Sequence, residues 1–502
     1  MKSRTENAGK NLIATVIYQI TNIIMKFGMR TIFVYCLGKE YLGVNGVFSN
    51  ILSMLSLAEL GLGSAIVYDM YKPVAEGNEE KICQYLKLYK AIYTFIGCFI
   101  LLAGVCLIPF LDKILTDVPN VEHIKVIYIL FLLKTSISYF WAEYTSLLGI
   151  YQMEYINKRY LSIFAVIKSA VESVFLLITR NYIIYLVIEI VLMIISNYCI
   201  YKKAIVLFPF IRKKVLMLKK EEVLAVCKNA LGTFSIKFNG TVLGATDNLI
   251  ISALISTVLV GIYSNYDMVI QMVLFFTVMI KNAVTGGVGN LCAKESKDKK
   301  YEVFKKIFFL YGSIYMVVAV CLLNLLEPFI LLWLGVGYHL DKIVVCIVVF
   351  NCYLSGMLQP IEIYTFADGL FVHYKWKPWI EAAINLIVSV ILTKYFGLIG
   401  VFLGTTISKI STSIWFDAYI VYHYSFQLRF NEYWKRFMCY LGITVIVAIL
   451  SYWIVSKVNI FVGKVAISLG LSFIVWLGVF YRTEEFIFYK RLLIKRMKRE
   501  KN

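Results

Sequence analysis

The chain has 502 residues, of which 60% are hydrophobic and only 16% are charged, and its formal net charge is +20. Because about a quarter of the residues in a soluble globular protein are charged, this composition excludes an ordinary soluble protein and indicates a polytopic membrane protein. The eleven cysteines include no C-x-x-C pair and the four histidines are scattered, so we expect neither disulfides nor a metal site.

The hydrophobic residues form long runs, each near the ~20 residues that a helix needs to cross the hydrocarbon of a bilayer. Runs of this length favour helices over a β-barrel. We therefore predict an all-α integral membrane protein with about fourteen transmembrane helices, at 11–35, 43–68, 89–110, 124–148, 160–179, 182–201, 229–254, 262–288, 304–326, 343–366, 379–394, 398–422, 437–456 and 464–481.

The first predicted span carries a polar stripe that contains two permanent cations. At about 100° per residue, one helix face holds Thr15, Gln19, Asn22, Lys26 and Arg30. Such a stripe would cost several kcal/mol if it faced lipid, so it must face a protein interior or a wet cavity. Two interpretations remain open, an internal salt bridge between helices and a cationic pathway for an anion.

The second span is predicted to carry a similar polar face. Within about 40° of Asn45 on an ideal helix lie Ser49, Ser56, Glu59 and Gly63. Glu59 is the charged member of this face.

Charged residues also occur in the fourth and fifth spans. Lys134 and Glu143 lie on opposite faces of the fourth span, so both cannot line one cavity. Lys168 and Glu172 are one turn apart in the fifth span, and this spacing predicts a local ion pair.

Weak self-similarity relates the two halves of the chain. Gly43 begins the second span and Gly261 begins the eighth, and the pairs Lys10-Asn11 and Lys228-Asn229 show the same offset. We therefore predict two six-helix pseudo-repeats of equal orientation, with substrate between them and alternating access by rocking. The boundaries that we expect are an N-terminal lobe at 1–201, a basic amphipathic linker at 202–228, a C-terminal lobe at 229–424, helices 13 and 14 within 425–481, and a basic tail at 482–502.

The linker and the two last spans lie outside the repeat. Phe208–Cys227 mixes leucine and valine with lysine, and this mixture predicts a helix in the cytoplasmic interface. Helices 13 and 14 carry few polar residues, and we expect them to be a lipid-facing addition.

Polar faces recur in spans 7, 8 and 10. Span 7 aligns Lys237, Thr241, Gly244 and Asn248 on one face, with Asp247 a quarter-turn away. Span 8 aligns Asp267, Gln271, Lys281 and Asn282, and span 10 aligns Asn351, Ser355 and Glu362. Because spans 1, 2, 7 and 8 are equivalent pairs of the repeats, we predict that they share a central cavity.

The residue types in this cavity indicate binding of an anion. Lys26, Arg30, Lys237 and Lys281 would donate charge-assisted hydrogen bonds to phosphate oxygens, beside Gln19 and Asn22. The carboxylates Glu59, Asp247 and Asp267 would bind Na⁺, exchange a proton or simply neutralise neighbouring cations. We expect no cofactor, with Na⁺ or H⁺ as the alternatives for a coupling ion.

Lysine and arginine crowd alternate loops. They are abundant in 202–228, 294–306 and 482–502, whereas the intervening loops hold about one or two each. The positive-inside rule then places both termini and the basic loops in the cytoplasm, which requires an even number of spans. The basic charge is therefore topological, and its expected partner is anionic lipid rather than nucleic acid. We expect a multi-pass protein of the plasma membrane.

Two segments resemble a known transporter family. The stretch Tyr41–Lys81, with Leu42-Gly43, Glu59–Gly63 and Tyr71–Pro73, resembles the first hairpin of Wzx-type polysaccharide flippases. These belong to the multidrug/oligosaccharidyl-lipid/polysaccharide exporter superfamily. Gly397–Thr406 is similar to the penultimate hairpin of that family. The resemblance covers most of residues 1–425, and its motifs are specific to the fold more than to a substrate.

The resemblance implies export of an undecaprenyl-pyrophosphate-linked oligosaccharide to the outer leaflet, without covalent chemistry. The product would serve synthesis of capsule, O-antigen, exopolysaccharide or teichoic acid, with other polysaccharide assembly proteins as partners. Two spans beyond the usual twelve are similar to the lipid II flippase branch, which leaves the substrate open.

Three other classes of function are alternatives to the export of a lipid-linked oligosaccharide. A multidrug and toxin exporter for organic cations would favour an acidic and aromatic lining, whereas the cavity candidates include four cations. A membrane polymerase or ligase would need a large external loop, and the longest one here has roughly 16 residues. A scaffold without transport activity is the remaining alternative. We expect a transporter and not an enzyme.

Overall fold

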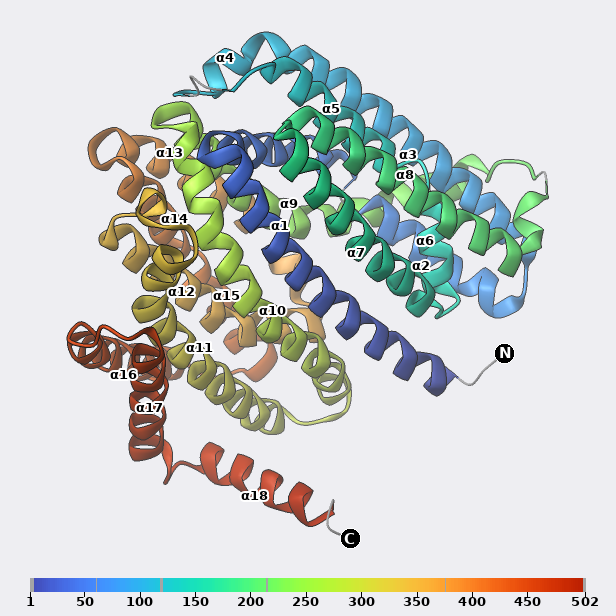
Figure 1. The fold of residues 1–502 in the computed structure, drawn as a ribbon. Helices are drawn as coiled ribbons and strands as arrows, with labels where there is room; N and C mark the ends of the chain where they lie inside the picture. The colour runs from blue at the N-terminus through green and yellow to red at the C-terminus, as the bar shows by residue number, and fades with distance from the viewer. Residues whose placement is uncertain (1–3, 60, 118–120, 214, 375, 500–502) are drawn as a thin grey trace. The chain divides into compact units, whose positions relative to one another are not determined.

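The computed structural model describes residues 4–59, 61–117, 121–213, 215–374 and 376–499 (Figure 1). Every regular element in this part of the chain is helical. Twelve of the described helical segments are long and apolar enough to cross a membrane. The predicted class, an all-α multi-pass membrane protein, is confirmed. The count of fourteen and the cytoplasmic placement of both termini stay predictions.

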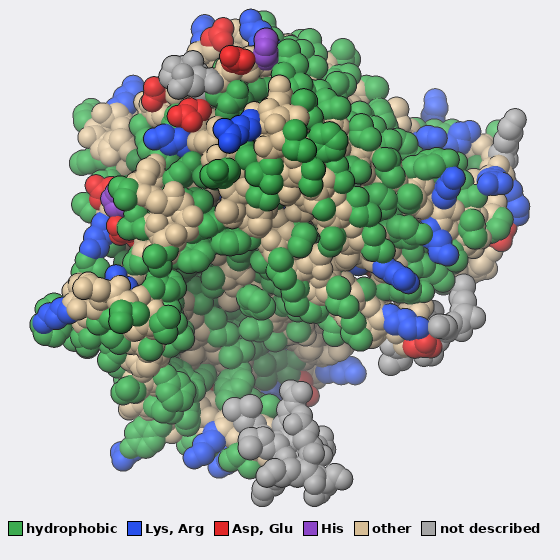
Figure 2. Space-filling model, viewed as in Figure 1, with side chains coloured by type: hydrophobic (Ala, Val, Ile, Leu, Met, Phe, Trp, Pro, Cys, Tyr) green, Lys and Arg blue, Asp and Glu red, His purple; other side chains and the backbone are tan. Residues whose placement is uncertain are grey.

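Hydrophobic side chains dominate the face of the molecule in Figure 2, and the lysine and arginine side chains gather toward its margins. Many large apolar side chains are exposed, among them Leu12 at 63%, Phe95 at 71% and Ile178 at 75%. Lipid would cover such side chains in a membrane. The chain divides into two compact units, Met1–Ser264 and Asn265–Asn502.

The first unit is built from helices that pack side by side. Its elements are α1 (Arg4–Leu55), η1 (Ser56–Glu59), α2 (Leu62–Glu76), α3 (Glu79–Leu107), η2 (Ile108–Phe110), α4 (Leu111–Ile114), α5 (Ile124–Ser138), α6 (Ala142–Ile150), α7 (Glu154–Thr179), α8 (Tyr182–Leu207), η3 (Pro209–Arg212) and α9 (Lys220–Leu254). Helix α7 packs along α1 and α8, and α8 also packs on α5.

Two glycines divide the first part of the chain. α1 is kinked at Gly38, where φ is 80°, so one long segment holds the first predicted span and the beginning of the second. The second span is interrupted again, because η1 follows Leu55 and Gly61 has φ of 92°. Glycine adopts positive φ without a Cβ clash. The prediction that Asn45 and Glu59 share one helix face is therefore wrong.

The basic linker is not the interfacial helix predicted over Phe208–Cys227. Pro209–Arg212 forms a turn of 3₁₀-helix, the backbone is extended at Lys213 and Lys219, and the residues from Lys220 to Cys227 belong to α9. Proline lacks the N–H that would continue α8. α9 then begins at Lys220, where the Glu222 carboxylate accepts from the Lys219 backbone N–H at 3.3 Å.

α9 contains the predicted seventh span, and it packs on α1 and α2. The structure therefore groups this helix with the first compact unit. The predicted lobe boundaries at 201, 228 and 424 stay predictions.

The second unit follows from α10 onward. Its elements are α10 (Thr257–Lys294), which begins in the first unit, α11 (Lys297–Leu334), η4 (Val336–Tyr338), α12 (Lys342–Ala367), η5 (Leu370–Tyr374), α13 (Lys377–Phe396), α14 (Leu398–Ser411), α15 (Ser413–Ile420), the π-helix η6 (Val421–Phe426), α16 (Asn431–Val455), α17 (Phe461–Phe480) and α18 (Glu484–Arg499). The twelfth predicted span is thus divided into α14, α15 and η6.

Helices α16 and α17, the predicted spans 13 and 14, pack against α11. The buried Asn324 amide of α11 donates to Ser451 Oγ at 2.9 Å and to Ser468 Oγ at 3.2 Å. Hydrogen bonds in an apolar interior fix the helices to one another. The expectation of a merely lipid-facing addition is corrected on this point, because one face of each helix is bonded to α11.

Candidate functional site

The polar stripe of α1 lies on regular helix before the Gly38 kink, so its predicted shared face is retained. Gln19, Asn22 and Arg30 are half-buried, and Lys26 is exposed. The Arg30 guanidinium donates from Nη1 to Ser264 Oγ at 3.2 Å. Within the described residues Lys26 has neither a hydrogen bond nor an ion pair, and its electrostatic neighbours are the cations Lys168 and Arg30.

A network of ion pairs surrounds Glu189 of α8. Lys134 of α5 contacts its carboxylate at 2.8 Å, and Lys168 of α7 contacts the other oxygen. Lys168 also lies 3.8 Å from Glu172, which confirms the predicted local pair. Both glutamates are buried, at 7% exposure for Glu189 and 1% for Glu172. Salt bridges therefore connect the three helices α5, α7 and α8.

We call Lys26, Lys134, Lys168, Glu172 and Glu189 the cationic cluster. In the described part of the chain, it sets three ammonium groups against two carboxylates. Arg30 brings a further cation close to Lys26. Because a charge in a membrane span is costly unless it is paired or hydrated, the ammonium of Lys26 favours an anionic partner or water.

Aromatic side chains fix α8 against α1 beside this cluster. The Tyr182 hydroxyl accepts from the Asn45 amide at 2.8 Å. Phe33, one turn after Arg30, meets the Tyr182 ring edge-on at 5.3 Å between centroids. Tyr182 and Tyr185 stack at 5.7 Å. This packing holds the polar face of α1 in a defined orientation.

Glu189 was absent from the sequence-based candidates. A glutamate inside an otherwise apolar span is itself a signal, because it requires a partner. The spacing along α8 could not identify Lys134 and Lys168, since both lie on other helices. Glu143 is buried in α6, whereas Lys134 lies on α5, so the two residues are on separate helices rather than on opposite faces of one span.

The remaining predicted cations have different surroundings. The Lys237 side chain lies outside the described part of α9. In the second unit Lys281 of α10 forms an ion pair with Glu362 of α12. Its charge is thus compensated within the protein, unlike that of Lys26.

The predicted ion-coupling carboxylates have the following surroundings. Glu59 accepts from the Tyr93 hydroxyl of α3 at 2.7 Å. Asp247 is half-buried in α9. Asp267 of α10 accepts from the Gln271 amide one turn away at 3.1 Å. In the described residues, no group of three metal-ligating side chains is present.

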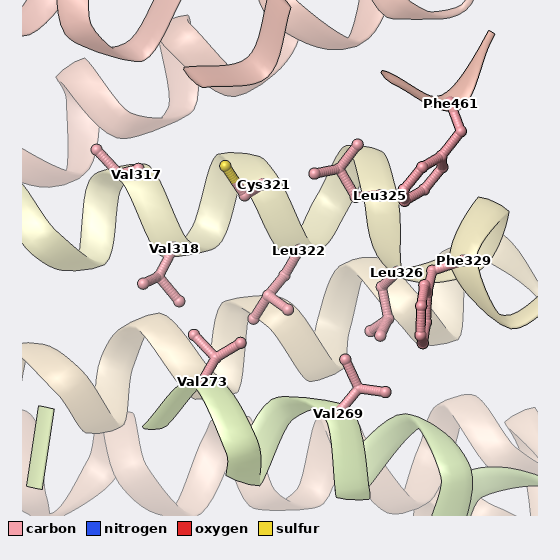
Figure 3. A pocket seen from close by; sticks show the side chains of 10 residues that line it. All are labelled: Val269, Val273, Val317, Val318, Cys321, Leu322, Leu325, Leu326, Phe329 and Phe461. Carbon is pink, nitrogen blue, oxygen red and sulfur yellow. The ribbon is translucent and has the colours of Figure 1, made fainter. Parts of the chain in front are cut away.

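The second unit contains an apolar pocket of about 310 Å³ (Figure 3). Figure 3 shows the side chains of α10 and α11 that face it, together with Phe461 at the start of α17. The lining consists of Val269, Val273, Val317, Val318, Cys321, Leu322, Leu325, Leu326, Phe329 and Phe461. It offers no donor to a phosphate, and its chemistry suits a hydrocarbon chain.

Comparison with known proteins identifies the fold. No protein-family model matches the chain, and no curated protein matches it in sequence. A solved structure of the lipid II flippase MurJ, in an inward closed conformation, is 16% identical with a TM-score of 0.67, and the match covers 96% of this chain and 99% of that one.

Two multidrug transporters are also similar. An inward-facing multidrug resistance MATE family transporter of the MOP superfamily is 13% identical with a TM-score of 0.61, over 85% of this chain and 99% of that one. The MATE multidrug transporter DinF-BH is 16% identical with a TM-score of 0.56, over 83% of this chain and 96% of that one. The chain therefore has the fold of these transporters.

Proposed function

We propose that this protein is a flippase for an undecaprenyl-pyrophosphate-linked oligosaccharide in the plasma membrane. The observation that carries this proposal is the exposed side chain of Lys26 on the membrane-spanning helix α1. Its charged neighbours are Arg30 of the same helix and Lys168 of α7. A pyrophosphate would supply the negative charge that this arrangement favours. The sugar would follow the headgroup, and the product would enter cell-surface polysaccharide synthesis.

The arrangement supports transport of an anion without covalent chemistry. Arg30 would bind two phosphate oxygens through its planar guanidinium, and Lys26 would act as a mobile point charge. Gln19 and Asn22 lie on the same face and would bind hydroxyl groups or water. An isoprenoid chain would fit the apolar pocket of Figure 3. Alternating access of the two lobes would move the headgroup across the membrane.

Lipid II and an organic cation remain as competing substrates. Lipid II also joins a pyrophosphate to a polyprenyl chain and a saccharide, and the likeness to MurJ in fold makes it a direct competitor. An organic cation is supported by the likeness to MATE multidrug transporters. The cationic cluster argues against it, because like charges repel.

Purified protein in liposomes tests the proposal. Flipping of lipid-linked oligosaccharide should fall at least about tenfold in Lys26→Ala and Arg30→Ala, since a hydrogen bond to a charged group contributes roughly 1.5–3 kcal/mol. Arg30→Lys should restore part of the rate, because one point charge replaces a bidentate fork. Arg180→Ala removes an exposed cation from the end of α7 and serves as the matched control.

Expression and thermal stability must be measured in the same samples. Normal stability with unchanged flipping in Arg30→Ala would refute the anion site. Transport of an organic cation but not of either lipid-linked saccharide would instead favour the multidrug exporter. Mass spectrometry of lipids that copurify with the protein would distinguish lipid II from an oligosaccharide carrier.

A further inference from the structure

A buried carboxyl group lies in the first unit, outside the cationic cluster. Glu143 is in the first turn of α6 and is 3% exposed. Neither of its carboxyl oxygens has a hydrogen-bond partner among the described residues. The cation that acts on it electrostatically is Lys90 of α3, whose side chain is exposed. Glu143 is therefore enclosed by protein without a contacting counter-ion in the part of the chain that the structure describes.

An ionised carboxylate would be costly at this position. A charge inside a membrane span is unfavourable unless it is paired or hydrated, and a buried carboxylate without a partner takes up a proton instead. The first turn of a helix favours negative charge. This effect offsets only part of the cost, because the helix dipole supplies a partial charge and not a counter-ion. The burial of Glu143 therefore favours a neutral carboxylic acid.

A row of three hydroxyl groups begins one turn after Glu143. The Ser146 hydroxyl of α6 donates to the Tyr89 hydroxyl of α3 at 3.0 Å. The rings of Tyr89 and Tyr93 stack at 4.3 Å between centroids, and their hydroxyls interact with each other. Tyr93 then donates to the Glu59 carboxylate of η1 at 2.7 Å. We call Ser146, Tyr89 and Tyr93 the hydroxyl row.

Gly63 of α2 allows the two tyrosine hydroxyls to meet. A Cβ at this position would be 2.2 Å from Tyr93 Oη and 3.0 Å from Tyr89 Oη. Any side chain there would push at least one hydroxyl away. The middle of the hydroxyl row therefore depends on a glycine that the sequence places on the polar face with Glu59.

Glu143 can reach the hydroxyl row by a rotation of its own side chain. Glu143 and Ser146 are three positions apart on α6, so their side chains are neighbours on one face of the helix. In the structure the Glu143 carboxyl group does not bond to the Ser146 hydroxyl. The path from Glu143 toward Glu59 is thus interrupted at this one step.

We propose that Glu143 binds one proton and exchanges it along the hydroxyl row. On release, the Glu143 carboxylic acid gives its proton to Ser146, each hydroxyl passes one proton to the next oxygen, and Tyr93 gives one to water at the end of the row. The net products are the Glu143 carboxylate and hydronium, and the hydroxyls are unchanged. Uptake reverses these steps, and the charge of the Glu143 side chain then changes from −1 to 0.

The titratable groups on α3, α6 and α8 leave Glu143 without a close cation. Lys90 of α3 is exposed, and Tyr89 belongs to the hydroxyl row. Tyr144 of α6 interacts electrostatically with Glu143, and its ring meets Tyr201 of α8 edge-on at 4.8 Å between centroids. Both tyrosines are neutral near pH 7.

Helices α2 and α7 also pack on α6. Asp69 of α2 acts on Tyr85 and would add a like charge rather than a counter-charge. Lys158 of α7 is paired with Glu154 at 3.2 Å. Neither helix therefore places a cation against Glu143 in the described structure.

Infrared spectroscopy of the purified protein, without substrate, tests proton binding directly. The carbonyl stretch of a protonated carboxylic acid should be present in the wild type at neutral pH, should decrease as the pH is raised, and should lose one component in Glu143→Gln. Glu154→Gln is the matched control, because that carboxylate is paired with Lys158. An unchanged band in Glu143→Gln would overturn the proposal, and so would an equal loss in Glu154→Gln.

A second variant protects this test against a folding defect in Glu143→Gln. Glu143→Asp keeps a carboxyl group in the same surroundings, so the component should remain at a shifted frequency. Its absence in Glu143→Asp protein that melts at the wild-type temperature would show that burial at this position does not hold a proton. That result would also overturn the proposal.

Transfer of the protein into D₂O tests the path. Exchange of the Glu143 proton shifts its carbonyl band, and the rate of this shift should fall severalfold in Tyr93→Phe, because the row loses a hydroxyl. Gly63→Ala should also slow it by displacing that hydroxyl. Tyr128→Phe is the matched control, since the buried Tyr128 hydroxyl donates to the Gly104 carbonyl at 3.1 Å, outside the row. Wild-type exchange rates in Tyr93→Phe and Gly63→Ala would overturn the path.

Coupling of this proton to transport rests on the proposed function. In liposomes, the flipping rate of the wild type should depend on an imposed pH difference, and Glu143→Gln should lose that dependence while Glu154→Gln keeps it. A component that disappears in Glu143→Gln together with no flipping of any lipid by the wild type would reject the proposed function and retain the proton site. Wild-type flipping that ignores the pH difference would reject the coupling.

Discussion

At the scale of single residues, charge pairing between helices determines which side chains remain available. Glu189 joins Lys134 and Lys168 from two other helices, so neither lysine is as accessible to a substrate as Lys26. Lys281 was expected to bind substrate, and its pairing with Glu362 lowers the charge that it offers.

The network around Glu189 leads to a stability prediction. Glu189→Gln would leave Lys134 without its counter-charge and would leave Lys168 with Glu172 alone, at 3.8 Å, so we expect a loss on the order of 3 kcal/mol in the free energy of unfolding. Thermal unfolding in detergent, followed by tryptophan fluorescence, measures it.

Glu79→Gln is the control for this prediction, because its pair with Lys213 at 2.7 Å is exposed to solvent. We expect no measurable change in that variant. Equal melting temperatures for Glu189→Gln and the wild type would show that the buried network does not hold α5, α7 and α8 together.

At the scale of elements, Gly43 and Gly261, the glycines that the predicted repeat relates, lie against each other. A Cβ on Gly43 would be 2.1 Å from the Thr257 carbonyl oxygen, and one on Gly261 would be 2.5 Å from the Lys39 carbonyl oxygen. The start of α10 therefore approaches α1 backbone to backbone. Nearby, the Thr257 backbone N–H donates to the Thr116 carbonyl at 3.0 Å.

Substitution of these glycines should separate the two segments. A disulfide between Thr116→Cys and Thr257→Cys should form readily in a background without native cysteines, since residues joined by such a hydrogen bond have Cα atoms within disulfide range. Adding Gly261→Leu should reduce the yield of this disulfide severalfold.

Gly28→Leu is the matched control, because nothing lies within 4 Å of a Cβ at that position of α1. The yield should remain at the level of the cysteine pair alone. If Gly261→Leu also left the yield unchanged, the glycine contact would not be what holds the segments together.

At the scale of the whole molecule, the proposed alternating access predicts that this contact opens and closes. The yield of the same Thr116→Cys and Thr257→Cys disulfide should differ between samples with and without lipid-linked oligosaccharide. Identical yields in both samples, and in the presence of a pH difference, would argue for a static bundle.

The basic linker is expected to bind anionic lipid. Replacing Lys213, Lys219 and Lys220 with Gln should weaken binding of anionic phospholipid by roughly 1 kcal/mol per charge at most, while substrate binding remains nearly intact. Native mass spectrometry of the lipids that copurify provides the measurement. Abolition of substrate binding would mean that the anion site includes the linker.

The amino-acid sequence by itself determined the membrane class, the helical composition and the polar stripe of α1. These features depend on the length of apolar runs and on periodicity within one helix, both of which are local. The stripe from Gln19 to Arg30 is therefore found on one helix, and the Lys168–Glu172 pair is found one turn apart.

Only the tertiary structure decided which charges compensate one another. Glu189 is paired with lysines that lie 55 and 21 positions away in the chain, at Lys134 and Lys168, and Asp417 meets Lys377 across two helices. The 3₁₀ turn at Ser56–Glu59 likewise moved Glu59 off the face that an unbroken α-helix would give it. Helix periodicity specifies a face, but the neighbour of that face depends on how distant segments pack.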